Sequence, residues 1–548
     1  MSFADSLSDS GGAASAADFD SQAKPQIPRL SLAHLSGLQE PVTLPLSEGL
    51  SAADFINIEA WMQRVLYDEK TGYYSAGVVD FDEREAAAAS TGGVAKAKAP
   101  DFGTFASSID SVLHLVLLDI AYRLYAARDP HEMGKPFLFV ELSGGNGILA
   151  QQFLQALSTL SETQAGIWSA LYTDMQYIIY EISPALAARQ AERNVDFIAS
   201  NHLTIKNVDA CMVSERKPDF VFSNELLDVM PAQKLFLKDD GEWLVEHAVP
   251  FIEVLPDLGV EPRAEFLDYI AQYFTASRKP IRGIPLDRTT FMELKEHADF
   301  DLSTVAWRAL HLPLAACPDV LDDVGGLLKV KAYQKSCTHV LSTNWFRLIE
   351  SILACGPKMA ALLDYGRYDA LGTDPLMRTY KGSLMSRDYL SVGAERVDVT
   401  YNIDFHLLTK PFYGMPSRPV TVFQGALARL ESILSLASKL RMKPDNVGVN
   451  LHKFIRAAFL SWTYVSASEA GAFPELKAGL AFDKAFSGPR GEEGAFARFY
   501  EPILERLEVL LAAQARKASG SALLFAERAE SGGAVDVAKD KAAGAELG

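Results

Sequence analysis

The chain has 548 residues, of which 49% are hydrophobic and 22% are charged, and its formal net charge is -18 at pH 7. This length and composition indicate a globular protein of two to three domains with sizeable cores. The acidic balance, without a dense Lys/Arg run, argues against a nucleic acid as the main partner.

The cysteines and the N-terminus narrow the class of protein further. The chain holds four cysteines, Cys211, Cys317, Cys337 and Cys355, with no CxxC pair and no ligand-like histidine cluster, so we expect reduced thiols and no metal. The first residues, MSFADSLSDSGG, resemble neither a secretory signal nor a transit peptide, and the longest apolar stretches are too short to span a bilayer. The sequence therefore predicts a cytoplasmic protein without a membrane span.

The elements expected in chain order divide the protein into seven parts. They are a flexible N-terminal arm (1–50), an N-terminal helical segment (51–130) with a mobile insertion (84–100), a Rossmann-like core (131–255), a helical insert (256–357), late strands that complete the core (358–415), a C-terminal helical region (416–529) and a disordered tail (530–548).

Short apolar runs alternate with helical segments in the core. FLFVEL, YIIYEIS, HLTIKNV and DFVFSNE have the pattern of buried strands, and ILAQQFLQAL and PALAARQAERN that of helices between them. MAALLDYG, at 359–366, adds a late strand, and a periodic run at Leu451, Ile455, Phe459 and Trp462 predicts a helix. The alternation predicts an α/β fold with a doubly wound, mostly parallel sheet, helical insertions and a helical C-terminal part.

The stretch FLFVELSGGNGILAQQF, residues 137–153, predicts a strand, a glycine turn and a helix start. Its letters from Gly145 to Ala150 satisfy the dinucleotide fingerprint GxGxxA. The next strand-end acid, Glu181, lies about 31 residues beyond Ala150, which is long for the ribose acid of a dinucleotide site. Glu141, directly before the turn, would repel a pyrophosphate.

S-adenosylmethionine (SAM) fits this pattern better, since it carries an amino group and a sulfonium and has no phosphate. Glu141 would face its cationic part and Glu181 its ribose hydroxyls. Small residues in the turn let the backbone approach the ligand, namely Ser143, Gly144, Gly145 and Gly147. The alternative for either acid is a solvated carboxylate at the end of a strand.

A third motif, SNELLDVMP (223–231), follows the apolar strand DFVF. Asn224 and Glu225 stand at the carboxyl end of that strand, where open α/β sheets bind ligands. If Glu225 begins a short helix, Asn224 can cap it and Asp228 lies near both. Two carboxylates and an amide on one face would grip a guanidinium or an ammonium. Helix capping with favourable acids in the first turn explains the pattern equally well.

Seven stretches in the same order resemble the MidA-type SAM-dependent methyltransferases, whose mitochondrial members assist the assembly of respiratory complex I and are associated with protein arginine methylation. The stretches are LYDEKTGYYS, the segment 101–104, ELSGGNG, YEISPALAARQ, SNELLDVMPAQKL, LLDYG and RVDVTYNIDF, spread over about 55–410. Ser143 departs from the family by replacing its first glycine. After Thr104, Ala106 and Ser107 replace a Pro-Glu pair.

The resemblance implies a class I methyltransferase that binds SAM and methylates a protein arginine, with a respiratory-complex subunit as one candidate partner. Glu225 and Asp228 would orient the guanidinium and receive its proton, with Asn224 beside the cofactor. Four further residues would line the substrate cleft, Asp364, Tyr365, Asp398 and Asp404, and Asp209 is a candidate adenine contact. Tyr73 and Tyr74 either close the pocket or, the preferred interpretation, lie in the core.

Three alternatives remain open. A small-molecule methyltransferase shares every motif, because the sequence does not name the acceptor. A SAM-binding assembly factor with little catalysis would keep the cofactor site alone. A nicotinamide oxidoreductase would bind NADH at the glycine turn.

Overall fold

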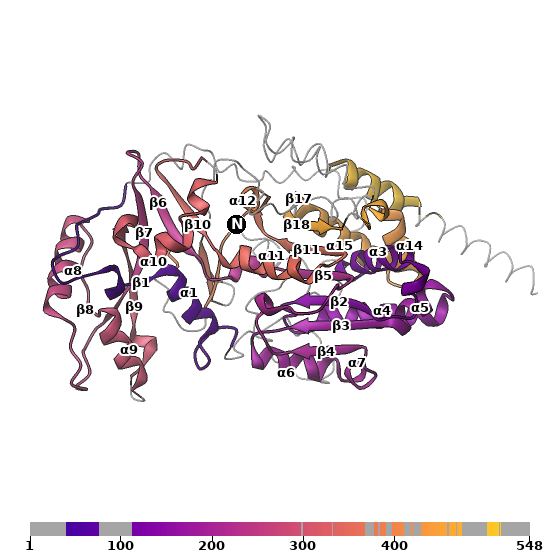
Figure 1. Cartoon of the computed structure of the whole chain (residues 1–548), viewed down its shortest axis with the longest axis horizontal. Helices are drawn as coiled ribbons and strands as arrows, with labels where there is room; N and C mark the ends of the chain where they lie inside the picture. The colour runs from indigo at the N-terminus through magenta and orange to yellow at the C-terminus, as the bar shows by residue number, and fades with distance from the viewer. Residues whose placement is uncertain are drawn as a thin grey trace, which may run out of the picture.

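A computed structural model describes residues 40–75, 112–297, 300–330, 332–367, 377–381, 384–390, 397–409, 418–419, 429–457, 460–466, 468–473, 501–513 and 516. The predicted insertion at 84–100, the segment 101–104 and the tail at 530–548 lie outside these residues. Two large sheets lie side by side along the long axis of the molecule, with helix α1 (Ile58–Tyr67) between them (Figure 1).

The first large sheet has seven strands in the order β17-β18-β11-β5-β2-β3-β4. Its strands are β2 (Phe137–Leu142), β3 (Met175–Tyr180), β4 (Leu203–Lys206), β5 (Phe220–Asn224), β11 (Met359–Asp364), β17 (Arg418–Pro419) and β18 (Leu460–Val465). All neighbours from β11 to β4 pair in parallel, whereas β18 is antiparallel to β11 and to β17. This order, which reverses between β2 and β5, is the doubly wound class I methyltransferase fold, and it confirms the predicted fold class.

The strands of this sheet form because their residues are apolar runs rich in aromatic and branched side chains, which a parallel sheet buries on both faces. The surrounding helices are α3 (Leu113–Ala126), α4 (Ile148–Thr163), α5 (Ile167–Asp174), α6 (Pro184–Arg193), α7 (Val195–Ala199), α11 (Asn344–Cys355), α14 (Leu430–Lys439) and α15 (Pro444–Ala457). Helices α3, α4 and α5 pack against one another, and α14 packs on α3.

The second large sheet is antiparallel and is built mainly from the chain between β5 and β11. Its strands are β1 (Ile56–Asn57), β6 (Gln233–Leu237), β7 (Trp243–Ile252), β8 (Ile284–Pro285), β9 (Ala306–Pro313) and β10 (Cys337–Leu341). Helices α8 (Ala264–Ala276), α9 (Arg288–Glu296) and α10 (Pro318–Val324) accompany it. The range 256–357, predicted as a helical insert, therefore also contributes strands β8, β9 and β10.

Short elements complete the described chain. Two small sheets contain β12 (Gly366–Arg367) with β16 (Ile403–Asp404), and β13 (Arg378–Lys381) with β14 (Leu384–Ser386) and β15 (Asp398–Thr400); helix α12 (Phe405–Thr409) follows β16. The 3-10 helices are η2 (Ala52–Asp54), η3 (Pro130–Glu132), η4 (Ala210–Met212), η5 (Leu227–Val229), η6 (Leu302–Thr304), η7 (Leu314–Ala316), η8 (Leu327–Lys329) and η9 (Ala470–Ala472).

Two sequence predictions are corrected by these elements. The periodic run ending at Trp462 is not one helix, because α15 ends at Ala457 and Trp462 lies in β18 opposite Leu362. The part of the predicted arm from residue 40 to 50 packs on the protein, since the Tyr269 hydroxyl donates to the Leu44 carbonyl at 3.2 Å. No helix among the described residues is long and apolar enough to cross a bilayer.

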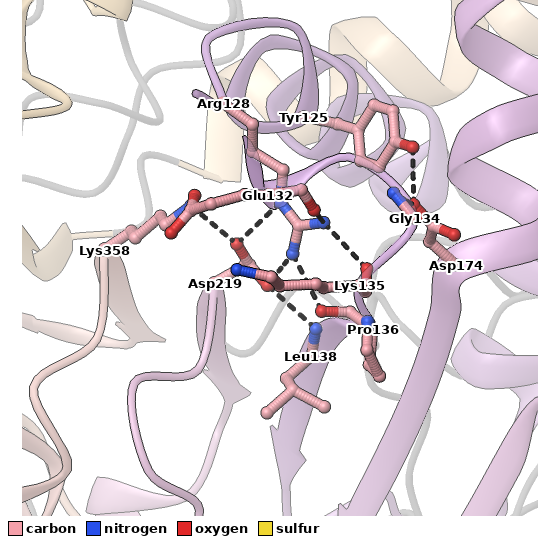
Figure 2. Close-up of polar contacts among 10 residues, drawn as sticks. All are labelled: Tyr125, Arg128, Glu132, Gly134, Lys135, Pro136, Leu138, Asp174, Asp219 and Lys358. Atoms are coloured by element: carbon pink, nitrogen blue, oxygen red, sulfur yellow. Dashed lines mark hydrogen bonds and ion pairs between the residues drawn. The ribbon is translucent and has the colours of Figure 1, made fainter. Parts of the chain in front are cut away.

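A buried ion cluster fixes the amino ends of β2, β5 and β11 (Figure 2). The Arg128 guanidinium donates to both carboxylate oxygens of Asp219, at 2.6 and 3.2 Å, and to the carbonyls of Lys135 and Pro136, at 3.0 and 2.8 Å. Asp219 also accepts from the backbone N–H of Leu138 at 2.9 Å and pairs with Lys358 at 3.1 Å. Charge-assisted hydrogen bonds therefore stabilise the cluster. It lies at the amino ends of the strands, at the opposite end of the sheet from their carboxyl ends.

Candidate functional site

The glycine turn connects β2 to α4 at the carboxyl end of the sheet. Ser143, Gly145 and Gly147 adopt positive φ angles of 64°, 54° and 78°. A Cβ on Gly144 would lie 2.7 Å from Cγ2 of Ile179, and one on Gly147 would lie 2.8 Å from Nδ2 of Asn194. The small residues are thus required by the backbone geometry and by close packing of the turn against β3 and α6.

Ser143 carries a side chain in the left-handed region, at the position where the family it resembles has glycine. Ser143→Gly should raise the free energy of unfolding by about 1 kcal/mol, because it relieves the strain of a non-glycine residue at φ 64°. Chemical denaturation measures this change, and SAM affinity by calorimetry should stay unchanged. Gly147→Ala is the opposing control and should destabilise. A loss of stability or of SAM affinity in Ser143→Gly would show that the hydroxyl makes a contact stronger than the strain.

The two predicted cofactor acids lie at the ends of neighbouring strands and are both buried. Glu141 accepts from the Tyr177 hydroxyl at 2.9 Å, and burial raises its pKa to about 8. Glu181 accepts from the Ser183 N–H and from Nε2 of Gln190, both at 3.0 Å, and burial raises its pKa to about 7.

Within the described residues neither carboxyl forms an ion pair, and the charge of Glu181 raises the pKa of Glu141 further. A pair of buried acids without a cation suits a cationic ligand, which would stabilise their ionised forms. These two carboxylates at the carboxyl end of the sheet therefore fit SAM, the cofactor that the sequence predicts.

An exposed apolar side chain, Ile182, directly follows Glu181, and another, Met212, lies in η4; the sequence analysis singled out neither. Nδ2 of Asn207 donates to the carbonyls of Glu181 and Ile182, at 2.8 and 3.2 Å, and so brings the end of β4 beside the end of β3. Ile182 is 41% exposed and Met212, in η4, is 67% exposed. The sequence signal for this apolar surface was Ile182, an apolar residue directly after the strand-end acid Glu181. Asp209, the candidate adenine contact, caps η4, since its Oδ1 accepts from the Cys211 N–H at 2.7 Å.

The SNELLDVMP motif forms a turn and not the expected capped α-helix. Glu225 has φ 52°, its N–H donates to the Leu363 carbonyl at 2.8 Å, and the following helix is the short η5. Asn224 does not cap it, because its Nδ2 donates to Oε1 of Glu225 at 3.1 Å. The left-handed conformation of Glu225 redirects the chain at the end of β5. Asn224 and Glu225 therefore lie at the carboxyl end of the strand, and the residues of η5 are buried.

Asp364 at the end of β11 holds this turn. Its Oδ2 accepts from the N–H groups of Leu227 and Asp228, at 2.7 and 3.1 Å, and its Oδ1 accepts from the Tyr365 N–H at 2.7 Å. Burial and the charges of Asp228 and Glu225 raise the pKa of Asp364. Asp364 is fully buried, and its hydrogen bonds hold the backbone at Leu227 and Asp228 in place.

Asp228 is the central carboxylate of the site. It is buried, and burial raises its pKa to about 6, while the positive charge of Arg378 opposes that rise. Its Oδ1 and the Oδ1 of Asn224 are buried oxygens without a hydrogen-bond partner among the described residues. The Thr400 side chain also lowers the pKa of Asp228, and the two oxygens leave room for a further donor, which a bound ligand would supply.

Asp398 on β15 brings a second carboxylate to the same place. Burial and the charge of Asp228 raise the pKa of Asp398 to about 7, and its Oδ1 accepts from the Tyr74 hydroxyl at 2.9 Å. Tyr67 and Tyr401 frame the turn through hydrogen bonds to its carbonyls: Tyr67 donates to Val229 at 3.0 Å and Tyr401 to Met230 at 2.6 Å.

Tyr73, as preferred from the sequence, lies in the core, whereas Tyr74 reaches Asp398. Tyr67 and Tyr401 lie in the stretches LYDEKTGYYS and RVDVTYNIDF but were not singled out within them, and Arg378 lies outside all seven stretches. Tyr365 borders the cluster and is 36% exposed. Partial burial, and next the charges of Glu225 and Asp228, raise the pKa of its hydroxyl. Asp404 instead lies at the start of α12, where its Oδ1 accepts from the Leu407 N–H at 2.9 Å.

The site therefore combines two parts near the carboxyl ends of the parallel strands. The glycine turn, Glu141 and Glu181 form the part that fits SAM. Asp228 and Asp398, ringed by tyrosines, form an anionic part that fits a cationic acceptor. The described residues contain no group of three or more His, Cys, Asp or Glu side chains arranged to hold a metal ion.

Comparison with known proteins gives one family match. Residues 122–413, more than half of the chain, match the family described as "Putative S-adenosyl-L-methionine-dependent methyltransferase". No curated protein matches the chain significantly.

Several solved structures are similar at low identity. Two come from Burkholderia thailandensis, a methyl transferase-like protein bound to S-adenosyl-homocysteine and an uncharacterized protein of the same superfamily. They share 17% and 16% identity, cover 76% and 77% of this chain and 89% and 91% of their own, and both have a TM-score of 0.48. Magnesium protoporphyrin IX methyltransferase from Synechocystis shares 14% identity over 43% of this chain and 88% of its own, with a TM-score of 0.18.

Proposed function

Because the chain belongs to this family of SAM-dependent methyltransferases, we propose that it transfers the methyl group of SAM to a guanidinium nitrogen of a protein arginine. The observation that carries the proposal is the buried carboxylate of Asp228, whose Oδ1 has room for a further donor, beside a second carboxylate, Asp398. A guanidinium is planar, stays charged and offers several N–H donors, which suits two carboxylates and an amide oxygen. The ordered motifs that resemble the MidA type support the same acceptor.

The cofactor would be held by the glycine turn and by the two strand-end acids. Glu181 retains lone pairs for the ribose hydroxyls, since each of its oxygens accepts one hydrogen bond within the chain. Glu141, buried directly before the turn, would face the cationic part, and the exposed Ile182 and Met212 would offer apolar surface for the adenine. SAM, when bound, supplies a methyl carbon activated by its sulfonium.

The acceptor carboxylates would orient the nucleophile and receive its proton. Asp228 would hold the guanidinium in line with the methyl carbon, which supplies most of the acceleration. As the N–C bond forms and the S–C electron pair passes to sulfur, the proton leaves the nitrogen. A carboxylate whose pKa is raised to about 6 accepts that proton near neutral pH.

The proposal is tested by supplying the purified protein with SAM carrying a labelled methyl group and a library of arginine-containing peptides. We expect labelled methylarginine on acid hydrolysis, and mass spectrometry of the host proteome should show an arginine that is methylated only when the wild-type chain is present. Label that appears only in small molecules would favour the alternative acceptor. SAM binding without any transfer would favour an assembly factor.

The pH dependence follows from the raised pKa values of Asp228 and Asp398. Their ionised forms attract the cation, so kcat/KM for the acceptor should fall as the pH drops through about 7 and fall more steeply below about 6. A bound guanidinium favours the ionised carboxylates, so the fall in kcat should occur at a lower pH than the fall in kcat/KM. Initial rates from pH 5 to 9 measure both profiles, and a flat kcat/KM over this range would exclude the two carboxylates as the cation site.

A further inference from the structure

We infer that Tyr74 is a positioning residue that links the two parts of the site; the inference rests on the proposed function. The cofactor half is the glycine turn with Glu141 and Glu181, and the acceptor half is Asp228 with Asp398. Tyr74 lies in the turn after α1, far in sequence from both halves. Its main chain contacts one half and its side chain the other, because Tyr74 forms hydrogen bonds with both Ser183 and Asp398.

The cofactor half is reached through the main chain of Tyr74. The Ser183 hydroxyl donates to the Tyr74 carbonyl at 2.7 Å. The N–H of the same serine donates to Oε1 of Glu181 at 3.0 Å, and its hydroxyl accepts from the Leu186 N–H at the start of α6. The position of the Tyr74 backbone is therefore linked to the position of the acid that would hold the ribose.

The acceptor half is reached through the phenol. Its hydroxyl donates to Oδ1 of Asp398 at 2.9 Å, which favours the ionised carboxylate. The other groups that act on Asp398 are Asp228 on η5, Arg378 on β13 and the tyrosines Tyr67 and Tyr380. Tyr74 therefore holds the second acceptor carboxylate in place and opposes the rise of its pKa caused by burial and Asp228.

A backbone hydrogen bond and a ring contact hold Tyr74 in place. Its N–H donates to the Leu66 carbonyl at the end of α1 at 2.9 Å. Its ring stacks on Tyr67, with centroids 5.9 Å apart and an interplanar angle of 25°, and Tyr67 is itself bonded to the Val229 carbonyl. Binding at one half that fixes this segment should then strengthen binding at the other half by the same factor.

Tyr74→Phe separates these effects, because it removes the hydroxyl and keeps the main-chain link. We expect the acceptor KM to rise roughly tenfold, the size of a lost hydrogen bond to a charged group, while the KM for SAM stays unchanged. The acid limb of the kcat/KM profile should move to higher pH, since Asp398 loses a donor that stabilises its ionised form. Calorimetry should show that S-adenosylhomocysteine strengthens binding of an arginine peptide to the wild type and does so less in the variant.

Tyr125→Phe is the matched control, because it removes another hydroxyl bonded to a carboxylate, Asp174, at 2.6 Å, away from the site. It should leave the acceptor KM, the pH profile and the calorimetric coupling unchanged. Superimposable profiles and equal coupling for wild type and Tyr74→Phe would overturn the inference and leave the proposed function standing. A wild type that methylates no arginine substrate would overturn both.

Discussion

Asp228→Asn should lower the rate of methyl transfer by about a hundredfold or more while SAM binding stays intact. The asparagine has the same shape and keeps its N–H bonded to Asp364, so the turn should hold. It removes the charge that, in the proposed mechanism, would hold the guanidinium and the oxygen that would receive the proton. Single-turnover rates measure the chemical step, and calorimetry measures SAM binding.

Asp404→Asn is the matched control for Asp228→Asn. Asp404 is an acid on a late strand that serves as the cap of α12, and asparagine caps a helix equally well. Its rate should stay within twofold of the wild type. Full activity in Asp228→Asn would show that the acceptor is held elsewhere, whereas a loss of SAM affinity equal to the loss of rate would move Asp228 to the cofactor half.

Asp219→Asn should destabilise the protein by about 3 to 5 kcal/mol, the usual effect of removing one charge of a buried ion pair. The substitution leaves the buried Arg128 guanidinium with a neutral partner and weakens the pair with Lys358 (Figure 2). The midpoint of chemical denaturation should fall clearly. Activity at low temperature should change little, because the cluster lies at the amino ends of the strands.

The surface pair formed by Lys238 with Asp240 and Glu242 provides the comparison for Asp219→Asn. Its partners are exposed, so Lys238→Ala should leave the denaturation midpoint unchanged within error. A small effect of Asp219→Asn, comparable with that of Lys238→Ala, would mean that the cluster relaxes to admit water. A loss of activity without a loss of stability would contradict its structural role.

The central sheet and the cofactor half could be predicted from the sequence because their signals are local. β2 occupies the six residues of FLFVEL, and the positive φ angles fall within SGGNG. Consecutive parallel strands alternate with helices, so the chain order alone brings Glu141 and Glu181 to one edge of the sheet. Ser143 is the exception, since a serine gives no local sign that it adopts a left-handed conformation.

The acceptor half and the second sheet could not be predicted in the same way, because they depend on contacts between distant segments. Tyr74 and Asp398 are 324 positions apart, and only the folded chain joins them. β9 pairs with β7, but its residues, AWRALHLP, have no clear alternation that would distinguish a strand from a helix. Trp462 fits a helical spacing with Ile455, yet pairing with β11 places it in a strand.

The pairing of β18 with β11 also determines when the central sheet can close during synthesis. About a hundred residues separate the two strands, so at ordinary translation rates one edge of β11 stays unpaired for ~5–20 s after it leaves the ribosome. The first five residues of β11 are apolar, and an open apolar edge favours pairing with another chain. Slower synthesis of the residues between β11 and β18 would therefore lengthen the time during which this edge can pair with another chain.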